Sequence, residues 1–180
     1  NNSEFPLIIA HENNTEIFVN GNPTPIATLN AGQFFLIPTS NFLGSGNNFN
    51  MYIESSKPIF LYQIVSGSQS DATTGFYFIP PLSCFWQRSV DLIPDINKIA
   101  PSDSFSGNVI IATELGSTVT INDIITTAVP QVVTGKPNWV TYKVTGLSGN
   151  IKVESTGAVA VGVLGASGSA GFGGYFSGFG

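Results

Sequence analysis

The chain of 180 residues is long enough to bury a full hydrophobic core, as one large β domain or as two small ones. Charged residues make up only 9 % of it, the net charge is −5, and the six Lys and Arg residues stand singly. This excludes a basic surface that follows a nucleic-acid backbone. No stretch reaches the ~18 apolar residues of a membrane span either, so we expect neither nucleic-acid partners nor membrane insertion.

The cysteine content and the polar residues indicate in which cellular compartment the protein works. Cys84 is the only cysteine, so the chain can form neither an internal disulfide nor a cysteine-rich zinc site. Gly, Asn, Ser and Thr supply the polarity, which indicates a secreted or cell-surface protein, and the lack of disulfides favours a bacterial one. We expect Cys84 to be buried and unpaired, because it begins the apolar run Cys84-Phe85-Trp86. The abrupt end after an aromatic-glycine run leads us to expect a piece of a larger secreted polypeptide.

Short bursts of alternating apolar residues predict β-strands along the whole chain. Turn signals such as Asn20-Gly21-Asn22-Pro23 separate them, and the best helix candidate, 91–98, is interrupted by Pro94. We predict an all-β fold, a β-sandwich or jelly-roll-like structure with almost no helix. The side chains expected in its core are Ile17, Val19, Ile53, Ile59, Leu61, Val119, Ile121, Val153, Val159 and Val161.

Two halves of the chain repeat each other. The segment 7–20 returns as 109–122, at a spacing of 102 residues that matches Ala10 with Ala112. The segment 52–61 returns as 152–161, at a spacing of 100. A duplicated supersecondary unit explains both matches, and we expect each strand that contains one of these alanines to form a hairpin with the strand after it.

This repeat predicts the domain organisation. We expect a first β repeat at 1–82, a crossing segment at 83–107 that packs on the core through Phe85 and Trp86, and a second β repeat at 108–180. The three parts can form one compact unit. Alignment of 174–176 with 75–77 makes the glycine-rich end the last strand of the second repeat, with glycines where a backbone or a large ring comes close.

Several strand and turn motifs follow one another in a fixed order. They are Asn14-Thr15-Glu16-Ile17 with Asn20-Gly21, Leu29-Asn30-Ala31-Gly32-Gln33, Ile53-Glu54-Ser55-Ser56-Lys57-Pro58-Ile59, and Ile79-Pro80-Pro81-Leu82-Ser83 with Trp86 three residues on. In order and spacing they resemble the N-terminal domain of IgGFc-binding-protein-like sequences. The resemblance implies an extracellular β-rich module of adhesive or cell-surface multidomain proteins, with no catalytic residues to carry over. The missing cysteines and the glycine-aromatic end point to a bacterial branch, and antibody binding is not carried over.

Few residues offer catalytic or metal-binding chemistry. His11 is the only histidine, and its repeat counterpart is Thr113, so we expect no catalytic triad. Sites built from His and Cys are excluded by count. Calcium stays open, because Glu12/Glu114 and Glu54/Glu154 recur in both repeats, but no calcium-loop pattern is present. We therefore expect no metal and no cofactor.

One strand carries the candidate ligand-binding residues. In the segment 138–144, alternation places Trp139, Thr141 and Lys143 on one face, and a tryptophan among polar residues can stack on a sugar ring or fill a pocket of a partner. Alternatively, the loop 41–50 or a neighbouring domain covers Trp139.

Three functions stay open on these observations. The favoured one is a non-catalytic adhesion or binding module of a large bacterial surface protein, with an extracellular glycan or surface protein as its partner. The second is a structural spacer or assembly domain of a cell-surface filament, which contacts neighbouring domains or copies of itself. A polysaccharide-active enzyme is less favoured, although any two of the eleven acidic residues could face each other across a cleft.

Overall fold

The computed structural model describes residues 4–65, 75–83, 85–98, 106–167 and 170–176. Within these ranges the chain forms 18 strands and one short 3₁₀ turn, η1 (Thr39–Asn41), and no α-helix. The all-β prediction is confirmed. Cys84 lies outside the described residues, so its burial stays a prediction. In the described part of the chain, no helix is long and apolar enough to cross a membrane.

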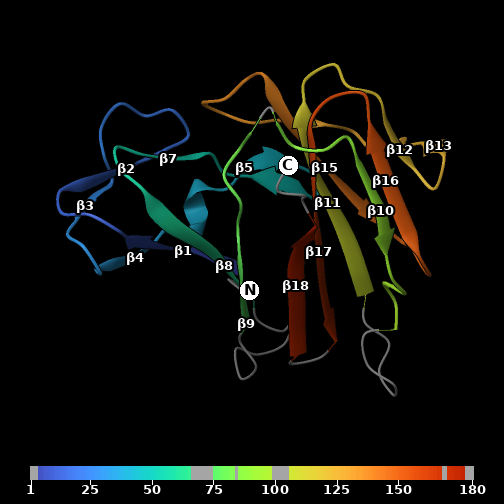
Figure 1. The fold of residues 1–180 in the computed structure, drawn as a ribbon, viewed down its shortest axis with the longest axis horizontal. Coiled ribbons are helices and arrows are strands. Elements are labelled where there is room, and N and C mark those ends of the chain that lie inside the picture. The colour runs from blue at the N-terminus through green and yellow to red at the C-terminus, as the bar shows by residue number, and fades with distance from the viewer. Residues whose placement is uncertain (1–3, 66–74, 84, 99–105, 168–169, 177–180) are drawn as a thin grey trace.

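The first half of the chain forms a small sandwich (Figure 1). Its two sheets are the first long sheet and the first short sheet. The first long sheet has the strand order β4 (Phe34–Leu36), β1 (Glu4–Ala10), β8 (Ile59–Val65), β9 (Gly75–Phe78). The first short sheet has the order β3 (Ala27–Leu29), β2 (Thr15–Val19), β7 (Ile53–Ser55). Ile8 and Ala10 from the first sheet and Ile17 and Val19 from the second share one buried core.

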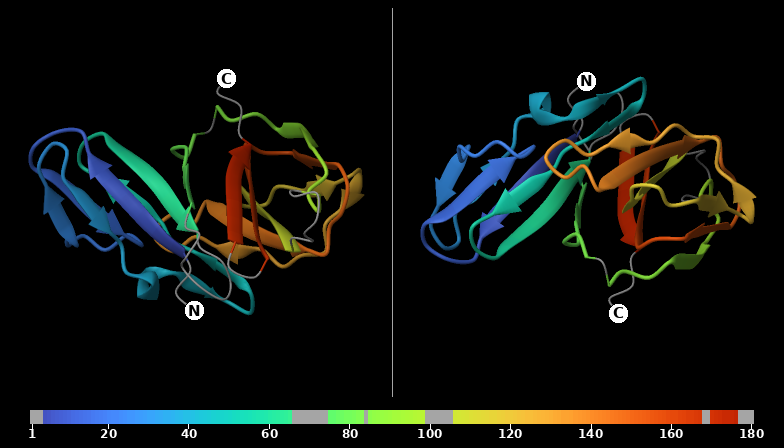
Figure 2. Two further views of the ribbon diagram at one scale, coloured as in Figure 1. Left: turned by 90° about the horizontal axis from the view of Figure 1, so that it is seen from below. Right: turned by 90° about the horizontal axis from the view of Figure 1, so that it is seen from above.

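The second half forms a larger sandwich with a corresponding strand order. Its second long sheet has the order β14 (Gln131–Val132), β15 (Trp139–Thr145), β11 (Ser106–Glu114), β17 (Val159–Ser167), β18 (Ala170–Phe176). Its second short sheet has the order β10 (Ser89–Ile93), β16 (Ile151–Ser155), β12 (Val119–Ile121), β13 (Ile124–Ile125). Figure 2 shows the two sandwiches side by side. The core of the second one gathers residues from both of its sheets, among them Ile111, Val119, Val140, Val153 and Val161.

The hairpin expected between consecutive strands is wrong in both halves. β1 pairs with β4 and β8, whereas β2 pairs with β3 and β7. β11 and β12 likewise lie in opposite sheets. The loop after β1 crosses from one sheet to the other, because the apolar faces of both strands can then be buried against each other in one core.

Pairing registers also correct the alignment of the first strand. Ala10 pairs with Ile59 and faces the core. In the second half, the buried residue that pairs with the corresponding Val159 is Thr113. Ala112, which the 102-residue spacing matches with Ala10, points to the other side of its sheet. Three consecutive apolar residues in each copy conceal this shift of one residue, which reverses the face of every side chain in a strand.

The residues expected in the core are buried, with three exceptions. Seven of the ten predicted core residues are buried. Ile53, Ile59 and Leu61 are only half-buried and pack at the margin of the first core. They belong to β7 and β8, which border a cleft described below, so the second half does not close over them.

Segments without a counterpart in the other half complete the second sandwich. From the crossing segment, β10 joins the second short sheet beside β16, and Val90, Ile93 and Ile96 enter the second core. Trp86 packs as expected, whereas Phe85 is 84 % exposed. A Cβ on Gly173 would overlap the ring of Tyr77, as expected for the last strand.

The hairpin of β5 (Leu43–Ser45) and β6 (Asn48–Asn50) is inserted in the first half and reaches the second. Asn48 Nδ2 donates to the Thr141 carbonyl at 2.8 Å, and Asn50 Nδ2 donates to Thr141 Oγ1 at 2.9 Å. The hairpin thereby fixes the first half against the outer face of the second long sheet.

Candidate functional site

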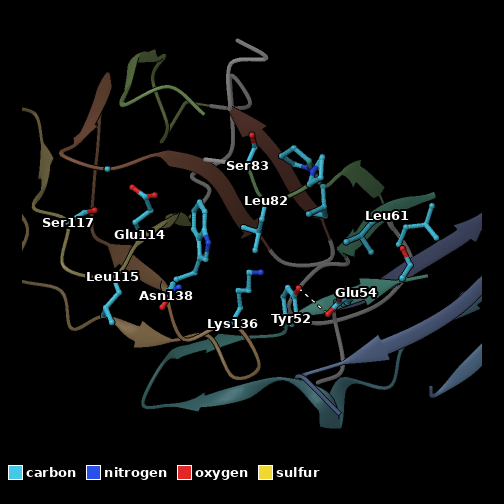
Figure 3. A pocket seen from close by; sticks show the side chains of 18 of the residues that line it. Tyr52, Glu54, Leu61, Leu82, Ser83, Glu114, Leu115, Ser117, Lys136 and Asn138 are labelled. Atoms are coloured by element: carbon cyan, nitrogen blue, oxygen red, sulfur yellow. Dashed lines mark hydrogen bonds between the residues drawn. The ribbon is translucent and has the colours of Figure 1, made fainter. Parts of the chain in front are cut away.

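Two hollows lie between the sandwiches. The larger, which we call the outer cleft, has a volume of about 1070 Å³ and is lined by β7, β8 and the segment 78–83 on one side and by 114–117 and 136–139 on the other. Figure 3 shows this cleft, with Tyr52 and Glu54 on one wall and Glu114 and Asn138 on the other. The smaller, which we call the inner cavity, has a volume of about 460 Å³ and lies against the outer face of the second long sheet. Both volumes fall in or near the range of ligand sites.

Trp139 lines both hollows but is not an exposed anchor. Its side chain is only 8 % exposed, and it packs against Trp86, Val133 and Ala158. The rings of Trp86 and Trp139 meet edge to face, with centroids 5.3 Å apart at an angle of 78°. Of the two alternatives for Trp139, the covered one holds, but the cover is Trp86 of the crossing segment and not the loop 41–50 or a neighbouring domain.

Thr141 and Lys143 lie on the same side of β15 as Trp139, as alternation predicts, and all three residues line the inner cavity. Thr141 is bonded to Asn48 and Asn50, so the loop 41–50 covers Thr141, while Trp86 contacts Trp139. Asn50 Oδ1 is buried there and accepts no hydrogen bond in the described part of the chain. Whether these three residues bind a ligand stays a prediction.

Among the polar groups of the outer cleft, Tyr52 and Lys136 were not singled out from the sequence, whereas Glu54 and Glu114 were considered only as calcium ligands. The Tyr52 hydroxyl donates to Glu54 Oε2 at 3.3 Å. Burial, followed by the neighbouring Glu54 carboxylate, raises the pKa of Tyr52. Lys136 Nζ lies 5.8 Å from the centroid of the Tyr52 ring, which places a cation over an aromatic face in the middle of the cleft. Glu114 Oε2 accepts the backbone N–H of Ala158 at 3.1 Å.

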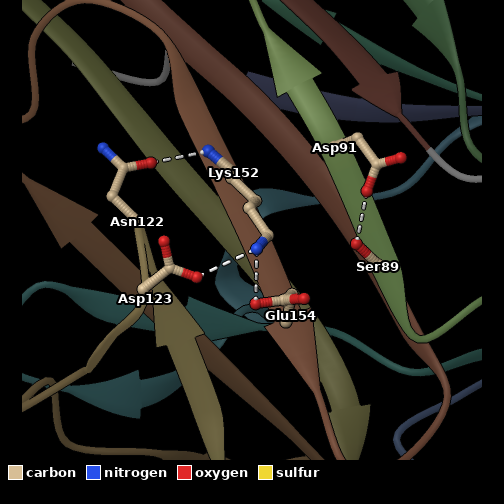
Figure 4. A network of polar contacts seen from close by, with 6 residues as sticks. All are labelled: Ser89, Asp91, Asn122, Asp123, Lys152 and Glu154. Carbon is tan, nitrogen blue, oxygen red and sulfur yellow. Dashed lines mark hydrogen bonds and ion pairs between the residues drawn. The ribbon is translucent and has the colours of Figure 1, made fainter.

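The recurring glutamates have different roles in the two halves. Glu54 faces the outer cleft, whereas Glu154 lies on the outer face of the second short sheet (Figure 4). There Lys152 Nζ lies 3.0 Å from Glu154 and 2.9 Å from Asp123. Hydrogen bonds to Asp123 and Glu154 raise the pKa of Lys152 to about 12. The repeat of the glutamate therefore signals a strand position and does not by itself locate a site.

The described residues contain no group of three or more His, Cys, Asp or Glu side chains that could hold a metal ion. His11 is exposed, and its ring meets the edge of Phe60 with centroids 6.3 Å apart. The site thus consists of a half-apolar cleft with two carboxylates, one ammonium and one phenol. Such a set can hold a ligand by apolar contact and hydrogen bonds.

The chain is an all-β protein of two sandwiches with an open cleft between them. The IgGFc binding protein family model matches residues 1–165, so the chain belongs to this family. Neither a curated protein nor a solved structure matches it. The family is one of extracellular binding modules and not of enzymes, which agrees with the geometry of the cleft.

Proposed function

We propose that the chain is a non-catalytic extracellular binding module of a large bacterial surface protein, and that its outer cleft takes up a segment of another extracellular protein. One observation carries the proposal. Leu82 and Leu115 on opposite walls of the cleft are exposed, and the same lining holds one Lys, Lys136, and two carboxylates, Glu54 and Glu114. Exposed apolar side chains with a few polar groups between them suit the alternating side chains of a peptide.

The choice of a protein segment over a glycan rests on the aromatic residues. Sugar rings stack on the exposed faces of Trp or Tyr, but Trp139 is covered by Trp86 and Tyr52 is half-buried. The exposed apolar groups of the cleft are Phe and Leu side chains, which pack against other apolar side chains. The family name also refers to a protein ligand, although antibody binding belongs to that named protein.

The proposal is tested with a phage-displayed peptide library and, as a separate probe, purified IgG Fc fragment on the immobilised chain. Peptides enriched on the chain should lose at least about tenfold in affinity with Leu115→Ser or with Lys136→Glu. Leu92→Ser is the matched control, because Leu92 is 58 % exposed, close to the 57 % of Leu115, but lies on β10 outside the cleft.

Three outcomes would contradict the proposal in whole or in part. Failure to enrich any peptide, together with no binding of the Fc fragment, would remove a protein ligand. Binding that survives both cleft substitutions would place the ligand elsewhere. Hits on a glycan array that Leu115→Ser abolishes would keep the cleft but replace the ligand class.

A further inference from the structure

The outer face of the first long sheet is apolar throughout. We call it the aromatic face and define it by six side chains on three of its four strands, Phe34, Leu36, Phe60, Tyr62, Phe76 and Phe78. Register places them next to one another: Phe34 and Phe60 both lie opposite Ile9, and Tyr62 lies opposite Phe78. None of the six carries a charge.

Five of these six side chains are exposed to solvent, and Tyr62 is half-buried. Phe34 and Phe76 are each 67 % exposed, and Leu36, Phe60 and Phe78 are exposed as well. The ring of Tyr62 packs edge to face against the rings of Phe76 and Phe78, with centroid distances of 5.4 and 6.0 Å. At ~200 Å² for a whole Phe side chain, the five exposed residues alone leave about 500 Å² of apolar surface. A monomeric protein seldom exposes a larger patch.

The second half shows what covers the corresponding face. In the second long sheet this face carries Thr141, Lys143 and Ala112, and the β5–β6 hairpin of the first half lies over it. One sandwich of this fold therefore already buries the outer face of another. The second half has no corresponding inserted hairpin, since only the short loop 146–150 joins β15 to β16. Within the described residues, the aromatic face thus lacks the cover that its counterpart has.

We propose that the aromatic face binds the same face of a second copy of this chain, as the interface of a two-fold symmetric dimer. An uncharged apolar face can pack against itself, as an interface between identical partners requires. Two copies of a face of ~500 Å² would bury about 1,000 Å² in total, which reaches the lower limit for a specific interface. The outer face of the second short sheet differs, because Lys152 and Glu154 form an ion pair on it.

The aromatic face shares Phe60 and Phe78 with the lining of the outer cleft, whereas Phe34, Leu36 and Phe76 line neither hollow. Substitutions at these three positions therefore test the dimer separately from the proposed function. The dimer is tested by analytical ultracentrifugation of the whole chain over a dilution series. The wild type should sediment as a dimer that dissociates on dilution, and association should strengthen with added salt. The reason is that salt screens the repulsion between two copies of net charge −5 and leaves the apolar contact intact.

Phe34→Ser and Phe76→Ser should each raise the dimer dissociation constant by at least about tenfold. The matched control is Ile124→Ser, since Ile124 is 73 % exposed but lies on β13 of the other sandwich. It should leave the dimer intact. Circular dichroism melts show whether each variant is folded. Because Phe34 and Phe76 lie on different strands, β4 and β9, the two variants are independent tests of the same face.

A wild-type chain that sediments as a monomer at every concentration overturns the proposal. A dimer that both folded Phe variants retain overturns it too, as does a dimer that Ile124→Ser disrupts equally. If both Phe variants unfold, Leu36→Ser is tested in their place. A weaker dimer in this variant supports the proposal, and an unchanged dimer in the folded variant overturns it.

Discussion

Gly21 and Gly135 lie backbone against backbone at the contact between the two sandwiches. Both have left-handed backbones, with φ of 74° and 84°. A Cβ on Gly21 would lie 2.7 Å from Cα of Gly135, and a Cβ on Gly135 would overlap the backbone of Asn20 and Gly21. The two halves can approach this closely only because neither residue has a side chain.

Gly135→Ala should destabilise the chain by about 3 kcal/mol, from left-handed strain together with the overlap at the contact. Gly32→Ala is the matched control, because Gly32 has a φ of 78° but nothing within 4 Å of the added Cβ. It should cost only the strain, about 1 kcal/mol. Urea unfolding measures both. Equal losses would show that the close approach at Gly135 contributes nothing.

Asn20 and Asn122 should contribute alike to stability. Asn20 Oδ1 accepts the N–H of Tyr52 at 3.0 Å, and Asn122 Oδ1 accepts the N–H of Lys152 at 2.8 Å. Both residues have left-handed backbones. Each Asn→Ala change should cost about 1–2 kcal/mol in chemical denaturation. Asn122→Gly should cost less than Asn122→Ala, because both lose the hydrogen bond but only glycine relieves the left-handed backbone strain. A neutral Asn122→Ala would contradict this role.

Trp139→Ala should destabilise the chain by about 3–5 kcal/mol, because it leaves a cavity beside Trp86 and Val133. A double-mutant cycle with Trp86→Ala should give a coupling of about 0.5–1.5 kcal/mol for the edge-to-face pair. Thermal and urea unfolding are the measurements. An unchanged melting curve for Trp139→Ala would instead restore the exposed anchor that alternation alone predicts.

Lys152 should make stability depend on pH at high pH. Its folded-state pKa of about 12 lies above the ordinary 10.5, so its stabilising effect is fully present below pH 10.5 and is lost as the pH rises through 12. The urea midpoints of the wild type and of Lys152→Met should therefore converge between these values. The effect should be small, because the ammonium is exposed to solvent. A constant difference across that range would contradict the assignment.

Chelation should leave the chain unchanged. The described residues offer no cluster of three acidic or histidine ligands, and Glu114 and Glu54 are engaged with Ala158 and Tyr52. The melting temperature should therefore be the same in EDTA and in excess calcium. A fall of many degrees in EDTA would establish a calcium site and revive calcium-dependent adhesion.

Sequence periodicity sufficed for the elements and much of the core. Alternation in segments such as 17–19 and 119–121 predicts strands, because the two faces of a strand have different environments and the chain records this locally. Asn20 and Asn122 recur at corresponding turns because both positions have a left-handed backbone, which is a local requirement that the sequence also records. The family resemblance also follows from these local motifs, and the match over residues 1–165 confirms it.

Pairing, register and the site were decided only by the tertiary structure. Nothing local tells whether β2 pairs with β1 or crosses to the other sheet, and a run such as Ile110-Ile111-Ala112 is apolar on both faces. The second face of β11 is apolar because the first half covers it. Trp139 looks polar-facing by alternation, yet Trp86, 53 positions earlier, lies against it. Contacts between distant segments decide burial, and burial decides which side chains a ligand can reach.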